Sequence, residues 1–131
     1  MLQVLPIQEK AEQEALCARC GIDYKVDAMA YHALVDGRLT AVCQFRMDAE
    51  GGHILDLSTV KDVELTDRDR IESLFVMGRA ALNFMDLCGV EDAYFEGEES
   101  RLTKAVGFKK QEDGRLYMCL KGFFTSDPCK H

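Results

Sequence analysis

The stretch "MAYHALVDGRLTAVCQFRMDAEGGHILDLSTV", residues 29–60, contains three β-rich segments separated by two turn signals. Asp36-Gly37 separates the first two segments, and Ala49 to Gly52 separates the second from the third. An Asp-Gly pair between two such segments favours a tight hairpin, because these residues tolerate the positive φ angles of the turn. The stretch therefore predicts three consecutive antiparallel strands.

Residues 65–89, "LTDRDRIESLFVMGRAALNFMDLCG", predict one long helix directly after these strands. Apolar residues recur at three- and four-residue spacing from Ile71 to Cys88, and Gly89 is suited to end the helix. Thr66 is placed to accept a hydrogen bond from the N–H of Asp69, and acids in the first turn complement the helix dipole. We therefore expect the start of this helix to be capped by its own side chains.

The remaining elements lie on either side. Residues 2–5 predict a short strand. Residues 7–20 predict a helix that Gly21 ends, with Ala11, Ala15 and Leu16 on its inner side and Cys20 as a further candidate. After the long helix, "VEDAYFEG" predicts a strand, "EESRLTKAVG" a short helix and "FKKQEDGRLYMCLKGFF" a second hairpin. The order β-α-β-β-β-α-β-α-β-β predicts an α/β fold, a mixed sheet covered by helices.

Composition narrows the possible classes of protein. A chain of 131 residues has the size of one domain, and its net charge of -7 argues against a nucleic-acid partner. The first residues lack a signal-peptide pattern, and no stretch approaches the ~20 apolar residues that span a bilayer. We therefore expect a cytoplasmic location, no membrane partner and reduced cysteines. Cys17 and Cys20 share a helix face, but zinc would need two further ligands, so no metal site is predicted.

The element order, and in particular "LTKAVGFKKQEDGRLYMCL" (residues 102–120), resembles the GNAT family of acetyl-CoA-dependent N-acetyltransferases. In that family a short helix ends in an apolar-Gly-Phe turn, which is here Val106, Gly107 and Phe108. Residues 53–60 resemble the central strand of the family, and residues 79–96 resemble the second half of its cofactor-side helix with the next strand. The resemblance implies a single GNAT-like domain over residues 1–131 that moves an acetyl group from a thioester to an amine.

The resemblance also implies where acetyl-CoA would lie. In the family the central strand separates from its neighbour and its backbone pairs with the pantetheine arm, and the matching residues are Leu57, Ser58, Thr59 and Val60. A glycine-rich loop at the start of the next helix then holds the pyrophosphate on its N–H groups. The matching positions here read "DRIESL", residues 69–74, and contain no glycine. The pyrophosphate site is therefore expected to be weakened or lost.

Two arginines remain near this position. Arg68 and Arg70 could each reach a phosphate oxygen with a planar, doubly donating guanidinium. The favoured interpretation is that they pair with Asp67, Asp69 or Glu72 or simply face water, because charged runs at helix starts are usually solvated.

The catalytic residues of the family are only partly matched. A tyrosine that protonates the leaving thiolate commonly lies five residues before the phenylalanine of the Gly-Phe turn, and that position is Thr103. Catalysis would then need a carboxylate or histidine near the central strand, and the candidates are Asp56, His53 and Glu96. Asp56 interrupts an apolar strand and faces either solvent or the cleft. His53 follows a Gly-Gly turn, which favours an exposed position at the rim.

Two functions are compatible with these observations. The first is an acetyl-CoA-dependent N-acetyltransferase acting on a small-molecule amine with a weakened pyrophosphate loop. The second is a catalytically silent module of the same fold that binds a ligand or dimerises. Phe123 and Phe124 follow the last hairpin and need an apolar surface to cover them, so a homodimer is plausible.

Overall fold

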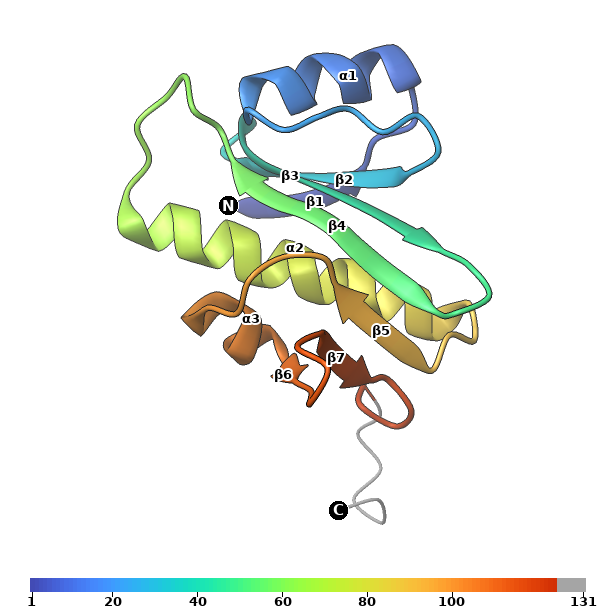
Figure 1. The fold of residues 1–131 in the computed structure, drawn as a ribbon. Helices are drawn as coiled ribbons and strands as arrows, with labels where there is room; N and C mark the ends of the chain where they lie inside the picture. The colour runs from blue at the N-terminus through green and yellow to red at the C-terminus, as the bar shows by residue number, and fades with distance from the viewer. Residues whose placement is uncertain (125–131) are drawn as a thin grey trace.

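The computed structural model describes residues 1–124, which form one seven-stranded sheet with three helices (Figure 1). The elements are β1 (Leu2–Pro6), α1 (Lys10–Arg19), β2 (Met29–Val35), β3 (Arg38–Met47), β4 (Gly52–Thr59), α2 (Asp67–Leu87), β5 (Asp92–Phe95), α3 (Arg101–Val106), β6 (Lys109–Lys110) and β7 (Leu116–Cys119). The strand order across the sheet is β1-β2-β3-β4-β5-β7-β6, and only β4 and β5 run parallel. The predicted element order and the mixed α/β sheet are confirmed.

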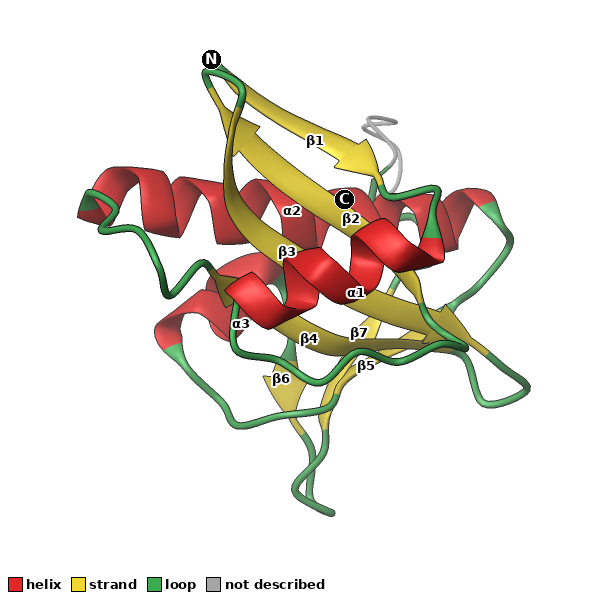
Figure 2. Cartoon of the chain, turned by 90° about the horizontal axis from the view of Figure 1, so that it is seen from above, coloured by secondary structure: helices red, strands yellow, loops and turns green. Residues whose placement is uncertain are grey.

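The helices lie on opposite faces of the sheet. Figure 2 shows α1 crossing one face, while α2 and α3 lie behind the strands. The larger apolar cluster lies between the sheet and α2, where Phe45, Ile54 and Leu82 are buried. A smaller cluster lies beneath α1, where Cys17 and Val42 are buried. These two sides of the sheet are named the α2 face and the α1 face.

Helix α2 begins as the sequence predicted. Thr66 is the residue before its first turn, and its side-chain oxygen accepts a hydrogen bond from the N–H of Asp69 at 3.1 Å. The buried side of the helix includes Met77 and Leu82. Ile71, which we expected on this side, is 59% exposed. The first turns of α2 project beyond the sheet, so this residue has no strand to cover it (Figure 1).

The inner side of α1 agrees with the prediction in part. Leu16 is partly buried and Cys20 is buried, as expected, but Ala11 and Ala15 are exposed. Gln13 and Cys17 face the sheet instead and are buried. The helix is turned in this way because the Gln13 amide reaches a polar partner on the sheet, Gln44 of β3, at 2.9 Å.

Strands β4 and β5 pair over only three positions, from Gly52 opposite Ala93 to Ile54 opposite Phe95. Strand β5 ends there, while β4 continues to Thr59 beside β3.

A β-bulge lies where the two strands part. Gln44 faces Asp56 and the next residue of β3 faces Ile54, so Leu55 is an extra residue in β4. Because of it, His53 and Asp56 lie on the α1 face although they are three positions apart. The bulge therefore places both predicted catalytic residues of β4 on the same side.

Candidate functional site

The second half of β4 carries backbone groups that no strand of the described chain pairs with. In an antiparallel pair, alternate residues direct their N–H and C=O groups toward the same partner. The N–H of Val60 donates to the carbonyl of Thr40 in β3 at 2.9 Å, so Ser58 and Asp56 also point toward β3. Leu57 and Thr59 therefore point to the other side, where β5 is no longer present.

This gap, called here the opening, has a defined apex and wall. At the apex the N–H of Glu96 donates to the carbonyl of Ile54 at 2.9 Å, and beyond it the chain turns away toward α3. On the α2 face the Leu57 side chain packs near Gly78, where an added Cβ would lie only 3.4 Å from it. An extended ligand that offers amide groups could pair with the free groups of Leu57 and Thr59.

Arg79 of α2 fixes α3 in place. Its Nε donates to the carbonyl of Val106 at 2.6 Å, and its Nη2 donates to the carbonyl of Ala105 at 3.2 Å. The guanidinium also lies 4.9 Å from the ring centre of Phe75 and 4.8 Å from that of Phe123. Phe123 thus finds part of its apolar contact within this chain, while 40% of it stays exposed.

The start of α2 offers no free row of amides at residues 69–74. The N–H of Asp69 bonds to the Thr66 side chain and that of Arg70 to the Thr66 carbonyl, and the following N–H groups lie within the helix. A pyrophosphate could be held on these amides only if the first turns of α2 unwound. Residues 69–74 thus lie within α2, with the helix start capped by its own side chain as the sequence predicted.

The two arginines at this helix start are paired along the helix. Arg70 donates to Asp67 from both of its terminal nitrogens, at 2.6 and 3.0 Å, and Arg68 Nε lies 3.5 Å from Glu72. These four side chains are largely solvent-exposed, so the ion pairs contribute little and can be exchanged for another anion.

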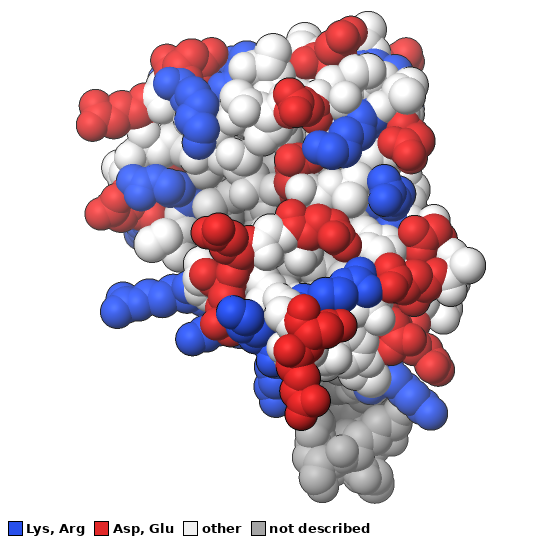
Figure 3. All heavy atoms as spheres, viewed as in Figure 1, with Lys and Arg blue, Asp and Glu red and all other residues white. Residues whose placement is uncertain are grey.

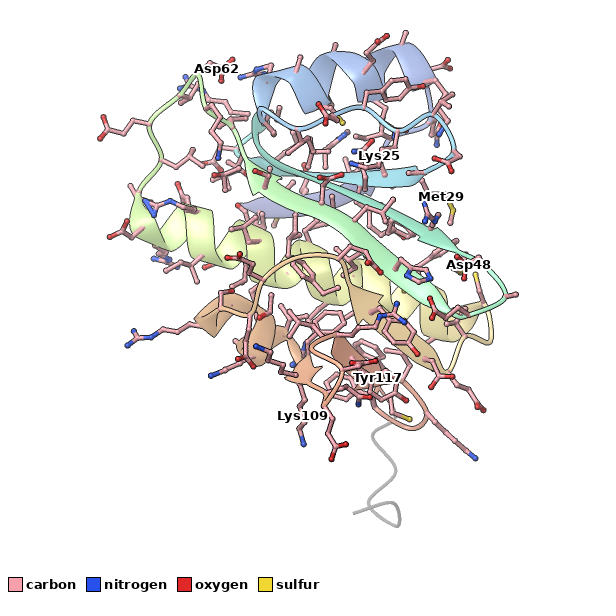
Figure 4. All side chains as sticks on the ribbon, in the orientation of Figure 1. Lys25, Met29, Asp48, Asp62, Lys109 and Tyr117 are labelled. Atoms are coloured by element: carbon pink, nitrogen blue, oxygen red, sulfur yellow. The ribbon has the colours of Figure 1, made fainter. Side chains whose placement is uncertain are left out.

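Asp56 belongs to a polar network beneath α1, called here the Asp56 network. Its Oδ2 accepts from Lys25 Nζ at 2.6 Å and from the Gln44 amide at 2.8 Å. Gln44 also accepts from the Gln13 amide at 2.9 Å and from the backbone N–H of Lys25 at 3.0 Å. The network ties the connection between α1 and β2, on which Lys25 lies (Figure 4), to the sheet.

His53 is 4% exposed, so the prediction of an exposed rim position is wrong. Its ring stacks against Tyr94 at 5.6 Å, and carboxylates cover both nitrogens. Nδ1 lies 2.7 Å from Glu96, and Nε2 lies 3.1 Å from Asp48. Because carboxylates only accept, both hydrogen bonds form together only when both ring nitrogens carry a proton.

The structure therefore brings His53 and Glu96 together and holds Asp56 in a separate network on the same face. Of the three, His53 is the least suited to accept a proton in this arrangement. The carboxylates of Asp56 and Glu96 remain the groups that can take one.

Arg115 closes the cluster around His53. It donates to Glu50 at 2.6 and 3.1 Å and lies 3.9 Å from the ring centre of Tyr94. Hydrogen bonding from Arg115 lowers the pKa of Glu50. The hydrogen bond from His53 likewise lowers the pKa of Asp48. Acidic and basic side chains are interleaved over this side of the molecule (Figure 3).

Within residues 1–124, the side chains that could hold a metal ion belong to the same cluster. Ligand atoms of Asp48, Glu50 and His53 lie within 4.8 Å of one another. A histidine nitrogen binds a metal ion only without its proton, and His53 Nε2 already lies 3.1 Å from the carboxylate of Asp48. Cys17 and Cys20 are buried, and burial raises the pKa of each thiol to about 11, so both are protonated near neutral pH.

Thr103 is a structural residue. It is 2% exposed, its hydroxyl donates to the Ser100 carbonyl at 3.0 Å, and its N–H bonds to the Ser100 side chain at 3.2 Å. The cap of α3 consists of this N–H bond and a reciprocal one, in which the Ser100 N–H donates to the Thr103 hydroxyl oxygen at 2.8 Å. The residue at the position of the family tyrosine therefore has no proton free for a leaving thiolate.

Two hollows lie away from the opening. One, of about 690 Å³, lies between the β2–β3 turn and residues 63–66. The other, of about 370 Å³, is mainly apolar and lies where β1 ends and β2 begins. Its lining includes the rings of Tyr31, Phe45 and Phe84, which contact one another in tilted and edge-to-face arrangements.

Sequence reasoning missed Lys25, Gln13 and Gln44. Gln44 interrupts the apolar run "AVCQF" of β3 just as Asp56 interrupts β4, so two polar interruptions in neighbouring strands were the available signal. Lys25 lies in an irregular connection and carries no pattern of its own.

Comparisons with known proteins bear on the fold. No protein-family model and no curated protein matches the sequence. Among solved structures, the chain is similar to an IAA acetyltransferase from Bacillus cereus, with a TM-score of 0.66 and 14% identity over 86% of this chain and 79% of that chain. It is similar to an acetyltransferase from Bacillus subtilis in complex with CoA, with a TM-score of 0.63 and 14% identity over 91% and 99% of the chains.

A third similar structure is the ribosomal-protein-S18-alanine N-acetyltransferase from Escherichia coli. Its TM-score is 0.62 at 11% identity, with 89% of each chain covered. At identities of 11–14% the likeness concerns architecture, and the chain has the fold of the GNAT acetyltransferases, as its sequence predicted.

Within residues 1–124, no helix combines the length and apolar character that crossing a membrane requires.

Proposed function

We propose that this protein is an N-acetyltransferase that takes its acetyl group from acetyl-CoA and passes it to a small-molecule amine. The observation that carries the proposal is the opening, where Leu57 and Thr59 present unpaired backbone groups beside the α2 wall. The pantetheine arm of coenzyme A contains two amides and is extended, which suits such an edge. The similar Bacillus subtilis structure is in complex with CoA.

The chemistry needs one proton acceptor beside the opening. The amine attacks the thioester carbonyl, a C–N bond forms, the C–S bond breaks, and the amine loses a proton. Asp56 is our first choice for the group that takes this proton, because it precedes Leu57 and lies on the α1 face. Glu96 at the apex is the second choice. Since Thr103 is engaged in its cap, the thiolate takes its proton from water.

The diphosphate of the cofactor is proposed to be held weakly. The amides of residues 69–74 are engaged, so Arg68 and Arg70 supply the only contacts proposed for it. Each must first leave its acidic neighbour on the helix. Binding should therefore depend strongly on salt, since exposed charge pairs are screened over about 8–10 Å at moderate ionic strength.

A second candidate is a catalytically silent module of this fold that binds an apolar small molecule. Two observations support it: residues 69–74 are helical with their amides engaged, and the Thr103 hydroxyl donates to the Ser100 carbonyl. The apolar hollow of about 370 Å³ beside Tyr31 and Phe84 falls within the usual size of ligand sites, about 300–1,000 Å³.

A binding experiment separates the two candidates. Thermal unfolding is followed with acetyl-CoA, free CoA and acetyl-pantetheine, which lacks the diphosphate and the nucleotide. A ligand at a hundred times its Kd adds about 2.7 kcal/mol, which is a shift of several degrees for this size. We expect acetyl-pantetheine to bind nearly as well as acetyl-CoA, because the contacts of the diphosphate add little to the binding free energy. No shift with either ligand at millimolar concentration would reject the enzyme and leave the silent module.

Two variants locate the diphosphate. Arg70→Ala should weaken acetyl-CoA and leave acetyl-pantetheine unchanged. Lys109→Ala removes one positive charge from the exposed strand β6 and serves as the matched control. If Arg70→Ala and Lys109→Ala bind acetyl-CoA equally, Arg70 is not part of the site.

A further inference from the structure

Lys25 presents a primary amine to the carboxylate that we place beside the opening. Its Nζ lies 2.6 Å from Asp56 Oδ2, which is the shortest polar contact of either side chain within residues 1–124. We propose that Lys25 is a self-acylation site, whose ε-amine accepts an acyl group from a coenzyme A thioester bound in the opening of the same chain. This inference rests on the proposed function and names an acceptor for it.

The backbone of Lys25 is held from both sides by buried amides. Its N–H donates to Gln44 Oε1 at 3.0 Å, and its carbonyl accepts from Gln13 Nε2 at 3.3 Å. Gln44 is fully buried and Gln13 is 1% exposed. Two interior glutamines thus fix a residue that lies in an irregular connection. Such fixation is what a reacting group needs, because a held geometry replaces a bimolecular encounter.

The amine lies on the correct side of the sheet for attack. Asp56 is on the α1 face, directly before Leu57, whose backbone groups point into the opening. Lys25 reaches Asp56 from the connection that crosses this face, and Figure 4 shows it between α1 and β4. One third of its side chain is exposed, against 17% of that of Asp56.

The reaction balances without any other reactant. The ammonium of Lys25 gives a proton to Asp56 and becomes a nucleophile. It attacks the thioester carbonyl, a C–N bond forms, the C–S bond breaks, and the amide nitrogen loses a second proton. One of the two protons protonates the leaving thiolate, and the other passes to water through Asp56. The product carries no charge at Lys25, so each chain reacts once.

A purely structural ion pair is the competing explanation, and it predicts a different reactivity. An amine that is held as an ammonium and two-thirds covered should react more slowly than a free lysine. Lys109, on the exposed strand β6, is the comparison within the same chain. Acylation assisted by Asp56 reverses this order.

The experiment measures acetylation of each lysine by peptide mass spectrometry during incubation of the full chain with acetyl-CoA. We expect Lys25 to react at least tenfold faster than Lys109 and to approach one acetyl group per chain. A reagent that modifies amines by exposure alone, an N-hydroxysuccinimide acetate, should give the opposite order. Equal or slower reaction of Lys25 with acetyl-CoA overturns the proposal.

Variants test the role of Asp56. Asp56→Asn should bring the Lys25 rate down to that of Lys109 and leave Lys109 unchanged. If this variant does not fold, Gln13→Met keeps the carboxylate and removes one of the two hydrogen bonds to the Lys25 carbonyl, the other being that from the Ala28 N–H, and it should lower the Lys25 rate as well. An unchanged Lys25 rate in a folded variant of either kind counts against the proposal.

Failure of this inference is distinguishable from failure of the proposed function. If acetyl-CoA raises the unfolding temperature and a small amine is acetylated while Lys25 is not, only the self-acylation is wrong. If acetyl-CoA gives neither a shift nor any acetylation, both are wrong.

Discussion

Replacing Gln44 by methionine tests the Asp56 network most directly. Methionine has nearly the same shape but neither donates nor accepts in the way that an amide does. Gln44 is fully buried and bonds to four groups: the Gln13 amide, the Lys25 N–H, the Asp23 carbonyl and Asp56. Of these, the Lys25 N–H loses its only partner within residues 1–124, whereas the other three keep another one.

The expected loss is worked from these four contacts. Leaving the Lys25 N–H unpaired costs about 1–3 kcal/mol, and each of the other three lost hydrogen bonds costs about 0.5–1 kcal/mol. Part of this is offset by burial of the apolar side chain, so we expect Gln44→Met to lower the free energy of unfolding by about 3 kcal/mol. For a chain of this length that corresponds to a fall of roughly 10 °C in Tm.

Urea unfolding followed by circular dichroism gives the free energy. Gln3→Met makes the same chemical change at an exposed position of the edge strand β1 and should change it by less than about 0.5 kcal/mol. If Gln44→Met loses less than about 1 kcal/mol, the network does not hold the connection between α1 and β2 as described.

The other predictions concern pH, a turn and a helix contact. The hydrogen bond from His53 lowers the pKa of Asp48 in the folded state. This bond therefore stabilises the fold at pH values above the ordinary carboxyl pKa, and its contribution is lost as the pH falls through the lowered pKa of Asp48. The urea midpoint should therefore fall between pH 5 and pH 3, and less steeply in Asp48→Asn; equal slopes would contradict this. Gly51→Ala should lower the free energy of unfolding by more than about 2 kcal/mol, because φ is positive there and the new Cβ would lie 2.2 Å from the Asp92 carbonyl oxygen. Gly89 also has a positive φ but open space around it, so Gly89→Ala should lower the free energy by about 1 kcal/mol in the same titration. Arg79→Lys should raise amide hydrogen exchange in α3, because lysine cannot donate to two carbonyls from a planar group; unchanged exchange would show that α3 is held by packing alone.

The fold was readable from the sequence because its signals are local. Asp36-Gly37 and the second Asp-Gly pair each mark a hairpin, and the 21 residues of α2 carry an apolar period between a Thr cap and a terminal glycine. Such signals act over a few residues and do not depend on distant partners.

The candidate site was less readable because its contacts join residues that are far apart in the chain. Lys25 meets Asp56 across 31 positions, and His53 meets Glu96 across 43. His53 was expected to be exposed because it follows a turn, but the stacked ring of Tyr94 and the distant carboxylate of Glu96 lie against it. The pairing of Arg70 with its helix neighbour was foreseen, since that contact is again local.

The extra residue Leu55 bends β4, and this bend matters for ligand binding more than for the stability of the sheet. Without it, β4 would keep the same alternation, with Asp56 and Leu57 facing their present sides, but the strand would lose its bend. A straight β4 could then pair with the chain that follows β5. The backbone groups of Leu57 and Thr59 would form hydrogen bonds within the sheet and would no longer be free for a ligand. We therefore expect a deletion of Leu55 to give a folded protein in which the opening beside β4 is closed.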